Sequence, residues 1–167
     1  MDRLSKEILK ELFPAEKDAD ALAATGQTGR RSPVDHWSAA VLLERAAYLR
    51  KLAKHGDGSA SETLKEYPRH SAMLLFRSRD GVAEVHENFA DVFYVLDGRA
   101  ALVTGGSVAD ATRIGPGEMR GISIEGGVRQ ELRAGDVAHV PAGVPHQMLV
   151  TSEKTVTCLV IKIQENP

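Results

Sequence analysis

Residues 135–147 read "GDVAHVPAGVPHQ", and this stretch carries the clearest indication of the fold. Gly135 and Asp136 are typical of a tight turn that leads into a strand. Pro141 and Gly143 are typical of a second turn. The next strand then begins at His146. The pattern predicts short strands joined by tight turns, with a histidine at the first position of one of them.

The same pattern of short strands and turns continues through the second half of the chain, from about Tyr67 onward. Its segments are short, rich in β-branched and aromatic residues, and separated by Gly, Pro or Asp about every ten residues. This spacing predicts an antiparallel sandwich or a small barrel. Residues 108–127 look like a longer, glycine-rich excursion between strands. The expected strands are "SAMLLFRS", "GVAEVHE", "DVFYVLDG", "AALVTGG", "VRQELRAG", "VAHVPAG", "HQMLV" and "TVTCLVIKI".

Residues 1 to about 65 are predicted to form helices and loops. The apolar residues Ile8, Leu9, Leu12 and Phe13 indicate a short opening helix that Pro14 ends. In "SPVD", Ser32 is a candidate N-cap and Pro33 suits the first helical position, so a second helix is expected to run to about Lys54. We expect its buried stripe to consist of Trp37, Val41, Tyr48 and Leu52.

Composition narrows the classes of partner and compartment. The 21 basic and 23 acidic residues give a net charge of -2, and no basic run could follow a phosphate backbone, so nucleic acid is not an expected partner. No segment has the length of a membrane span, and the charged N-terminus does not resemble a signal peptide. A single cysteine, Cys158, excludes a disulfide within the chain. We therefore expect a cytoplasmic protein.

The spacing in residues 135–147 resembles the second motif of the cupin superfamily. Five residues separate Gly135 from Pro141, one separates Pro141 from Gly143, and two separate Gly143 from His146. Val150 stands where this motif usually has Asn. The resemblance implies an all-β double-stranded β-helix, the cupin jelly roll. We accordingly predict a helical N-terminal extension at 1–66 and a β-barrel domain at 67–167.

The first cupin motif can be placed by counting back from Gly98. Six intervening residues lead to Asp91, a carboxylate in the position of the motif's Glu, and four more lead to His86 as the second histidine. Glu84 then stands where the first histidine would be. Glu84 and His86 have the same parity and so share one face of a strand. An alternative makes His86 the first histidine and Asn88 the second, but it leaves too few residues before Asp91.

The resemblance implies a divalent transition metal held by His86, His146, Asp91 and Glu84. Imidazole and carboxylate ligands suit Fe, Mn, Ni, Co or Zn. Glu84, Asn88 and water all remain candidates for the fourth position. We expect His139 to have a structural role and Cys158 to act as a small buried hydrophobe.

Cupins of this kind suggest two functions. One is a metal-dependent enzyme acting on a small organic molecule, of the dioxygenase, isomerase or lyase type. The other is a non-catalytic module that binds or senses a small molecule. The fold alone does not choose between them. The resemblance also suggests a homodimer.

Overall fold

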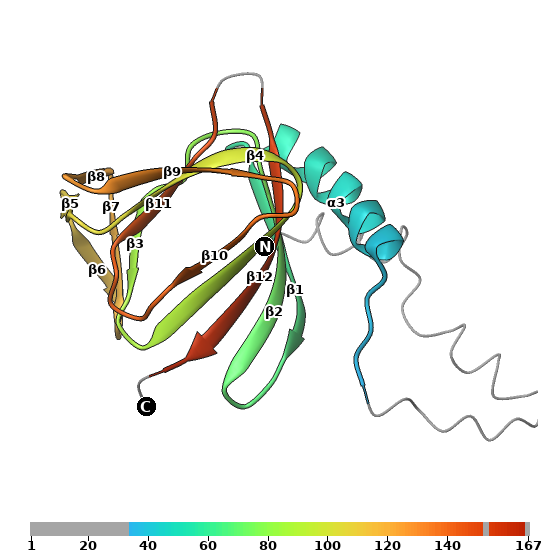
Figure 1. Ribbon diagram of the computed structural model, residues 1–167, viewed down its shortest axis with the longest axis horizontal. Helices are drawn as coiled ribbons and strands as arrows, with labels where there is room; N and C mark the ends of the chain where they lie inside the picture. Colours follow the sequence, from blue (N-terminus) through green and yellow to red (C-terminus); the bar gives the residue numbers. More distant parts are fainter. Residues whose placement is uncertain (1–33, 152–153, 166–167) are drawn as a thin grey trace, which may run out of the picture. The chain divides into compact units, whose positions relative to one another are not determined.

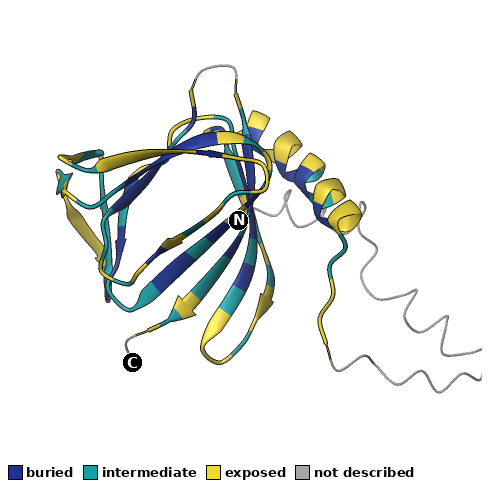
Figure 2. Cartoon of the chain, in the orientation of Figure 1, coloured by how far each residue is buried: buried dark blue, intermediate teal, exposed yellow. Residues whose placement is uncertain are grey.

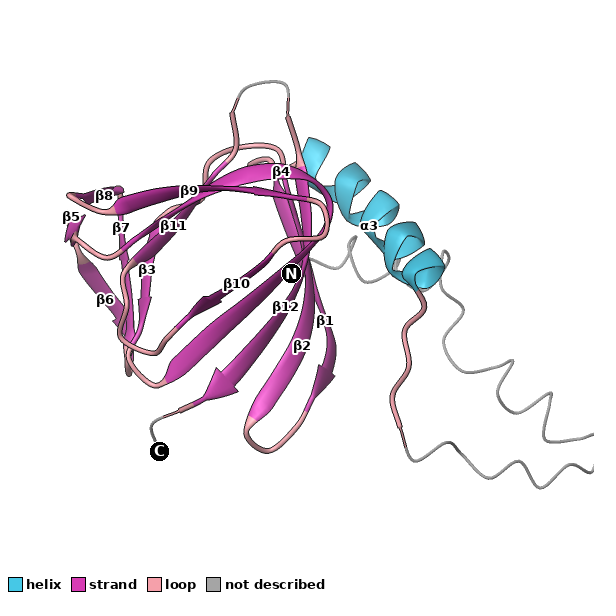
Figure 3. Ribbon diagram, viewed as in Figure 1, coloured by secondary structure: helices cyan, strands magenta, loops and turns pink. Residues whose placement is uncertain are grey.

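The computed structural model describes residues 34–151 and 154–165, and antiparallel β-sheet dominates this part of the chain (Figures 1 and 3). Helix α3 (Ala39–Lys54) precedes all of the strands. The first strands are β1 (Ser59–Glu66), β2 (His70–Arg77), β3 (Ala83–His86) and β4 (Phe89–Thr104). Four short strands follow: β5 (Ser107–Ala109), β6 (Thr112–Gly115), β7 (Glu118–Gly121) and β8 (Ser123–Glu125). The last are β9 (Val128–Arg133), β10 (Val137–Val140), β11 (His146–Leu149) and β12 (Val156–Gln164).

The long strand β4 connects two layers of sheet. Its first half pairs with β12 on one edge and β10 on the other, and the order β1-β2-β12-β4-β10 forms one layer. Its second half pairs with β9 and β11, and the order β9-β4-β11-β3-β7-β6 forms the other. The sheet thus curls into a half-barrel (Figure 1). The predicted all-β jelly roll with a helix before it is confirmed.

A glycine allows β4 to pass from one layer to the other. The sequence predicted two strands separated at Asp97 and Gly98, whereas the structure has one continuous strand. Gly98 has a φ of 80°, a left-handed conformation that costs little only for glycine. The β12 register also shifts here, because Thr157 pairs with Asp97 and Cys158 with Val95. The Asp-Gly pair is therefore a corner within a strand rather than a hairpin turn.

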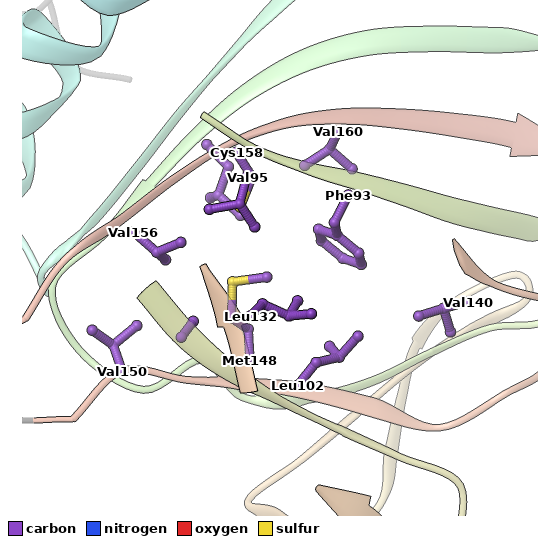
Figure 4. Packing of buried hydrophobic residues seen from close by; sticks show 12 residues of the cluster. Phe93, Val95, Leu102, Leu132, Val140, Met148, Val150, Val156, Cys158 and Val160 are labelled. Carbon is purple, nitrogen blue, oxygen red and sulfur yellow. The ribbon is translucent and has the colours of Figure 1, made fainter. Parts of the chain in front are cut away.

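The apolar core fills the space between the layers (Figure 4). Phe93 and Val95 alternate with the more exposed Tyr94, so one face of β4 points inward. Cys158 is fully buried, which confirms the expectation for this residue. The buried residues of this cluster are Leu75, Phe93, Val95, Ala100, Leu102, Leu132, Val140, Met148, Val150, Val156, Cys158 and Val160.

Helix α3 begins later than the sequence predicted. Its N-cap is Ser38, whose Oγ accepts a hydrogen bond of 3.3 Å from the Val41 amide, and residues 35–38 are not helical. The prediction that Ser32 caps this helix is therefore wrong, and Ser32 itself lies outside the described residues. Residues 39–43 read Ala-Ala-Val-Leu-Leu and are stronger helix formers as a group than the Asp, His and Trp before Ser38. The predicted end at Lys54 is confirmed.

The buried face of α3 also differs from the predicted stripe. Val41 and Leu52 are 42% and 41% exposed. Figure 2 shows the buried side of the helix turned toward the strands. Two alanines on that side let the helix approach the sheet closely, and this tertiary fit outweighs the aromatic spacing. The buried residues on α3 are Leu42, Ala46, Leu49 and Ala53, packed against Leu74 and Phe76 of β2.

Other differences concern segments with weak strand patterns. Strand β1 lies in a stretch expected to lack strands, because its mostly polar sequence hides the alternation of Ala60 and Leu64, which pack beneath α3. The excursion at 108–127 contains β6, β7 and β8 and part of β5.

The domain division at residue 66 stays a prediction. The predicted opening helix lies outside the described residues.

Contacts along the chain define two units, Met1–His36 and Trp37–Pro167. The second unit contains α3 and every strand named above. Among the described residues, none of the helical structure has the length and apolarity needed to cross a membrane.

Candidate metal centre

Three strands bring the predicted site residues together. Glu84 and His86 lie on one face of β3, and His146 opens β11 and pairs directly with Glu84 across the two strands. Asp91 lies near the start of β4, on the same face as Phe93. His86, Asp91 and His146 are each at most 5% exposed. The four side chains lie at the edge of the apolar core.

The ligand atoms of these side chains converge. Glu84, His86 and His146 each place one such atom within 4.8 Å of the others. The Nε2 atoms of His86 and His146 lie 3.4 and 3.5 Å from the same Asp91 oxygen, Oδ2. They lie 3.7 and 3.8 Å from Oε2 of Glu84. The two Nε2 atoms thus lie near one oxygen of Glu84 and one oxygen of Asp91.

Hydrogen bonds determine which nitrogen of each imidazole faces this point. Nδ1 of His146 lies 3.1 Å from the Val144 carbonyl oxygen, and Nδ1 of His86 lies 2.6 Å from Oε2 of Glu118. Both partners are acceptors, so Nδ1 carries the proton in each case. Each ring then turns Nε2 toward the two carboxylates. Four lone pairs without a donor between them repel one another unless a cation lies among them.

A divalent metal fits this donor set. Metal–ligand bonds of about 2.1 Å in tetrahedral geometry place neighbouring ligand atoms about 3.4 Å apart, close to the observed nitrogen–oxygen separations. Nε2 of His146 is buried and has no hydrogen-bond partner, which is the state expected of a metal ligand. Two imidazoles with carboxylates are typical ligands of first-row divalent metals.

Protons can replace the metal as the cation. Burial by itself lowers the pKa of His86, but hydrogen bonds to Asp91 and Glu84 outweigh it and raise this pKa to about 9. A proton on Nε2 of His86 then lies between the ring and the carboxylates. Metal and protons therefore compete for the same lone pairs.

Both carboxylates of the cluster are held in the ionised form. Burial tends to raise the pKa of Asp91, yet the two nearby histidines and the Lys162 ammonium hold it well below its usual range. Burial likewise opposes ionisation of Glu84, but its hydrogen bond to His86 and the charge of Arg120 lower its pKa. The carboxylates thus remain available as anionic ligands.

Three charged residues that neither sequence motif indicated also contact the cluster. Glu118 and Arg120 lie on β7, directly across from His86 and Glu84 in the register of the two strands. Glu118 contacts His86, and Arg120 forms an ion pair with Glu84. Lys162 lies opposite Asp91 on β12, with Nζ 2.8 Å from Oδ1 of Asp91. These partners belong to neither motif, and only strand pairing places them beside the site.

The remaining candidates lie elsewhere. The side-chain amide of Asn88 lies beside Gly117, in the turn before β7. His139 has a side chain that is 51% exposed, with Nε2 3.7 Å from Oε1 of Glu165. It neither lines the core nor orients a site residue.

A cavity of about 440 Å³ lies between β9 and β10, two strands that each pair with β4. It contains none of the four site residues, but it reaches Val144, whose carbonyl contacts His146. Its lining combines apolar residues of the core with polar side chains. The wall includes Leu102, Leu132, Ala138 and Val140, and the polar residues include Thr104, Gln130, Glu131, Asp136 and His139.

Comparison with known proteins agrees with this fold. Residues 117–162 match the family model described as "Cupin domain", a segment that holds His146 but not β3. No curated protein matches the sequence. The protein TT1209 from Thermus thermophilus has a similar structure, with a TM-score of 0.52 and 20% identity over 73% of this chain and 93% of that one.

Two further structures show weaker likeness. The polyketide cyclase RemF from Streptomyces resistomycificus has a TM-score of 0.47 and 19% identity, covering 66% of this chain and 68% of its own. A predicted oxalate decarboxylase from Thermotoga maritima has a TM-score of 0.48 and 14% identity, covering 64% and 80%. Residues 117–162 are thus similar to a cupin domain, and the chain has a fold similar to that of TT1209.

Proposed function

We propose that this protein is a metal-dependent cupin enzyme that acts on a small organic molecule. The observation that carries the proposal is that Nε2 of His86 and Nε2 of His146 each lie 3.4–3.8 Å from a carboxylate oxygen of Glu84 and of Asp91. His86, His146, Asp91 and Glu84 would hold one divalent transition metal there. Glu84 rather than Asn88 supplies the fourth ligand in this proposal, because Oε2 of Glu84 lies 3.7 and 3.8 Å from Nε2 of His86 and His146.

The bound metal would supply Lewis acidity toward an oxygen atom of the substrate. The chain contributes the orientation of the ligands and the charged partners that contact them. Phe93 packs edge-on to His146, with 6.2 Å between the ring centres, and limits the access of water on that side. The cavity beside Val144 offers room for the body of a small organic molecule, with both apolar and polar side chains in its lining.

Metal content tests this proposal directly. We expect protein purified without an affinity tag to bind about one equivalent of a transition metal, measured by elemental analysis after titration and gel filtration. His86→Ala and His146→Ala should each reduce this to less than about a tenth of an equivalent, because each removes a buried ligand. His139→Ala is the matched control and should retain full uptake. Absence of metal from the wild-type protein under all conditions would refute the proposal.

A second candidate is a metal-free module that binds a small molecule. It is favoured by the ion pairs of Arg120 with Glu84 and of Lys162 with Asp91, because these cations stabilise the carboxylates without a metal. The same titration separates the two candidates. The homodimer and the cytoplasmic location stay predictions.

A further inference from the structure

We propose that Glu118 is a positioning residue that holds the His86 ring with Nε2 facing the metal centre. This inference rests on the proposed function. Oε2 of Glu118 lies 2.6 Å from Nδ1 of His86, a short hydrogen bond in which the ring donates. A carboxylate in this place determines both the tautomer and the rotation of a ligand imidazole and increases its basicity.

The contact between Glu118 and His86 follows from the pairing of β3 with β7. β3 and β7 are antiparallel, with His86 opposite Glu118 and Glu84 opposite Arg120. Directly opposed residues on one face of such a pair lie within contact distance. The opposed side chains at both positions also carry complementary polar groups. One strand outside both sequence motifs thus supports two members of the site.

Arg120 joins the two contacts into one network. Its guanidinium forms an ion pair with Glu84, and its Nη2 lies 3.9 Å from Oε2 of Glu118. The Glu118 side chain is 29% exposed, so it is partly accessible to solvent while it contacts His86. Arg120 therefore limits the movement of Glu118 while Glu118 limits the rotation of His86.

The two histidines are oriented by different means. Nδ1 of His146 donates to the main-chain oxygen of Val144, a partner that any residue at position 144 would supply. Nδ1 of His86 has a side-chain partner. A substitution of Glu118 can therefore change the orientation of His86, whereas a substitution of Val144 leaves the main-chain partner of His146 in place. Substitution of Glu118 should disturb one ligand and leave the other in place.

Zinc affinity and nitrogen NMR of the histidine rings test the proposal in the full-length protein. Because Zn²⁺ is diamagnetic, two-dimensional ¹H–¹⁵N spectra of the loaded protein report which nitrogen of His86 carries the proton. We expect Glu118→Ala to weaken zinc binding about 10- to 100-fold and to broaden or shift the His86 Nδ1–H signal. The His146 signal should stay unchanged. Glu118→Gln retains an acceptor oxygen and should recover part of the affinity and the signal.

Two controls separate this role from general effects. Glu125→Ala removes another carboxylate, on exposed Glu125 at the end of β8, and should leave both the affinity and the spectrum as in wild type. Arg120→Met removes the charge between Glu84 and Glu118 and should retain the His86 Nδ1–H signal.

Each outcome has one meaning. If wild type binds zinc and Glu118→Ala binds it equally tightly with the His86 signal intact, Glu118 has no positioning role. The same conclusion follows if Glu118→Ala loses affinity while the His86 signal is unchanged. A wild-type protein that binds no zinc or other transition metal overturns the metal site itself.

Discussion

Asp91 is a buried carboxylate whose two oxygens have different partners. Its side chain is 5% exposed, and it presents one oxygen to both histidines and the other to Lys162. A buried carboxylate of this kind is stable only with complementary charge nearby. Lys162, 26% exposed in its side chain, supplies that charge from the neighbouring strand. The division of its two oxygens leaves Asp91 as a ligand through Oδ2 alone.

The importance of this pair can be measured with Lys162→Met, which retains most of the apolar stem and removes the charge. We expect the metal-free variant to lose about 1–3 kcal/mol of unfolding free energy, because a buried carboxylate loses a charged partner. Urea denaturation followed by circular dichroism measures this loss. Lys154→Met, at an exposed loop position, is the control. Equal midpoints for the two variants would show that the ion pair contributes nothing.

Among the elements, β4 decides the architecture because it belongs to both layers. A straight strand of sixteen residues could not pair with β12 at one end and β9 at the other without a change of direction. Gly98 and the shift in register beside it provide that change. A Cβ at Gly98 would collide with the main-chain oxygen of Thr155, so the two chain segments pack without space for a side chain.

This corner predicts a large effect for a small change. Gly98→Ala should destabilise the protein by more than the roughly 1–2 kcal/mol expected for a left-handed alanine, because a collision with the main chain is added. The unfolding midpoint in urea measures it. Gly126→Ala is the matched control, since Gly126 has a φ of 71° but open space around its Cβ position. If both variants lose the same free energy of unfolding, the main chain at Thr155 moves aside at little cost, and the predicted effect of the collision is wrong.

At the scale of the whole molecule, the core excludes water from the one thiol of the chain. Cys158 has an exposed fraction of 0% and lies among residues from both layers. Burial raises the pKa of its thiol from an ordinary 9.0 to about 12. The native thiol is therefore protonated and inaccessible at neutral pH. It can react with a thiol reagent only after the fold around it opens.

This pKa predicts how stability depends on pH. Below about pH 9 the thiol is protonated in both states and contributes no pH dependence. Between pH 9 and 12 the unfolded chain loses this proton while the folded chain keeps it, so the free energy of unfolding falls as the pH rises. Cys158→Ala should flatten this part of the profile relative to wild type, measured by denaturation at several pH values. Parallel profiles would show that the thiol is not held neutral in the folded protein.

The sequence alone predicted the elements and residues whose local pattern is strong. Alternating apolar residues indicated most of the strands, because one face of each strand is buried and the other is not. Fixed spacing of turn residues placed His146 at the start of a strand, and parity placed Glu84 and His86 on one face. These features depend on neighbours along the chain.

Tertiary structure decided which segments meet. The cap and buried face of α3, strand β1 and the continuous β4 follow from packing on a sheet rather than from local preference. Glu118, Arg120 and Lys162 reach the site through the pairing of strands distant in sequence. Opposite charge stabilises such pairs only when a particular register brings them into contact, and that register is set by the fold as a whole.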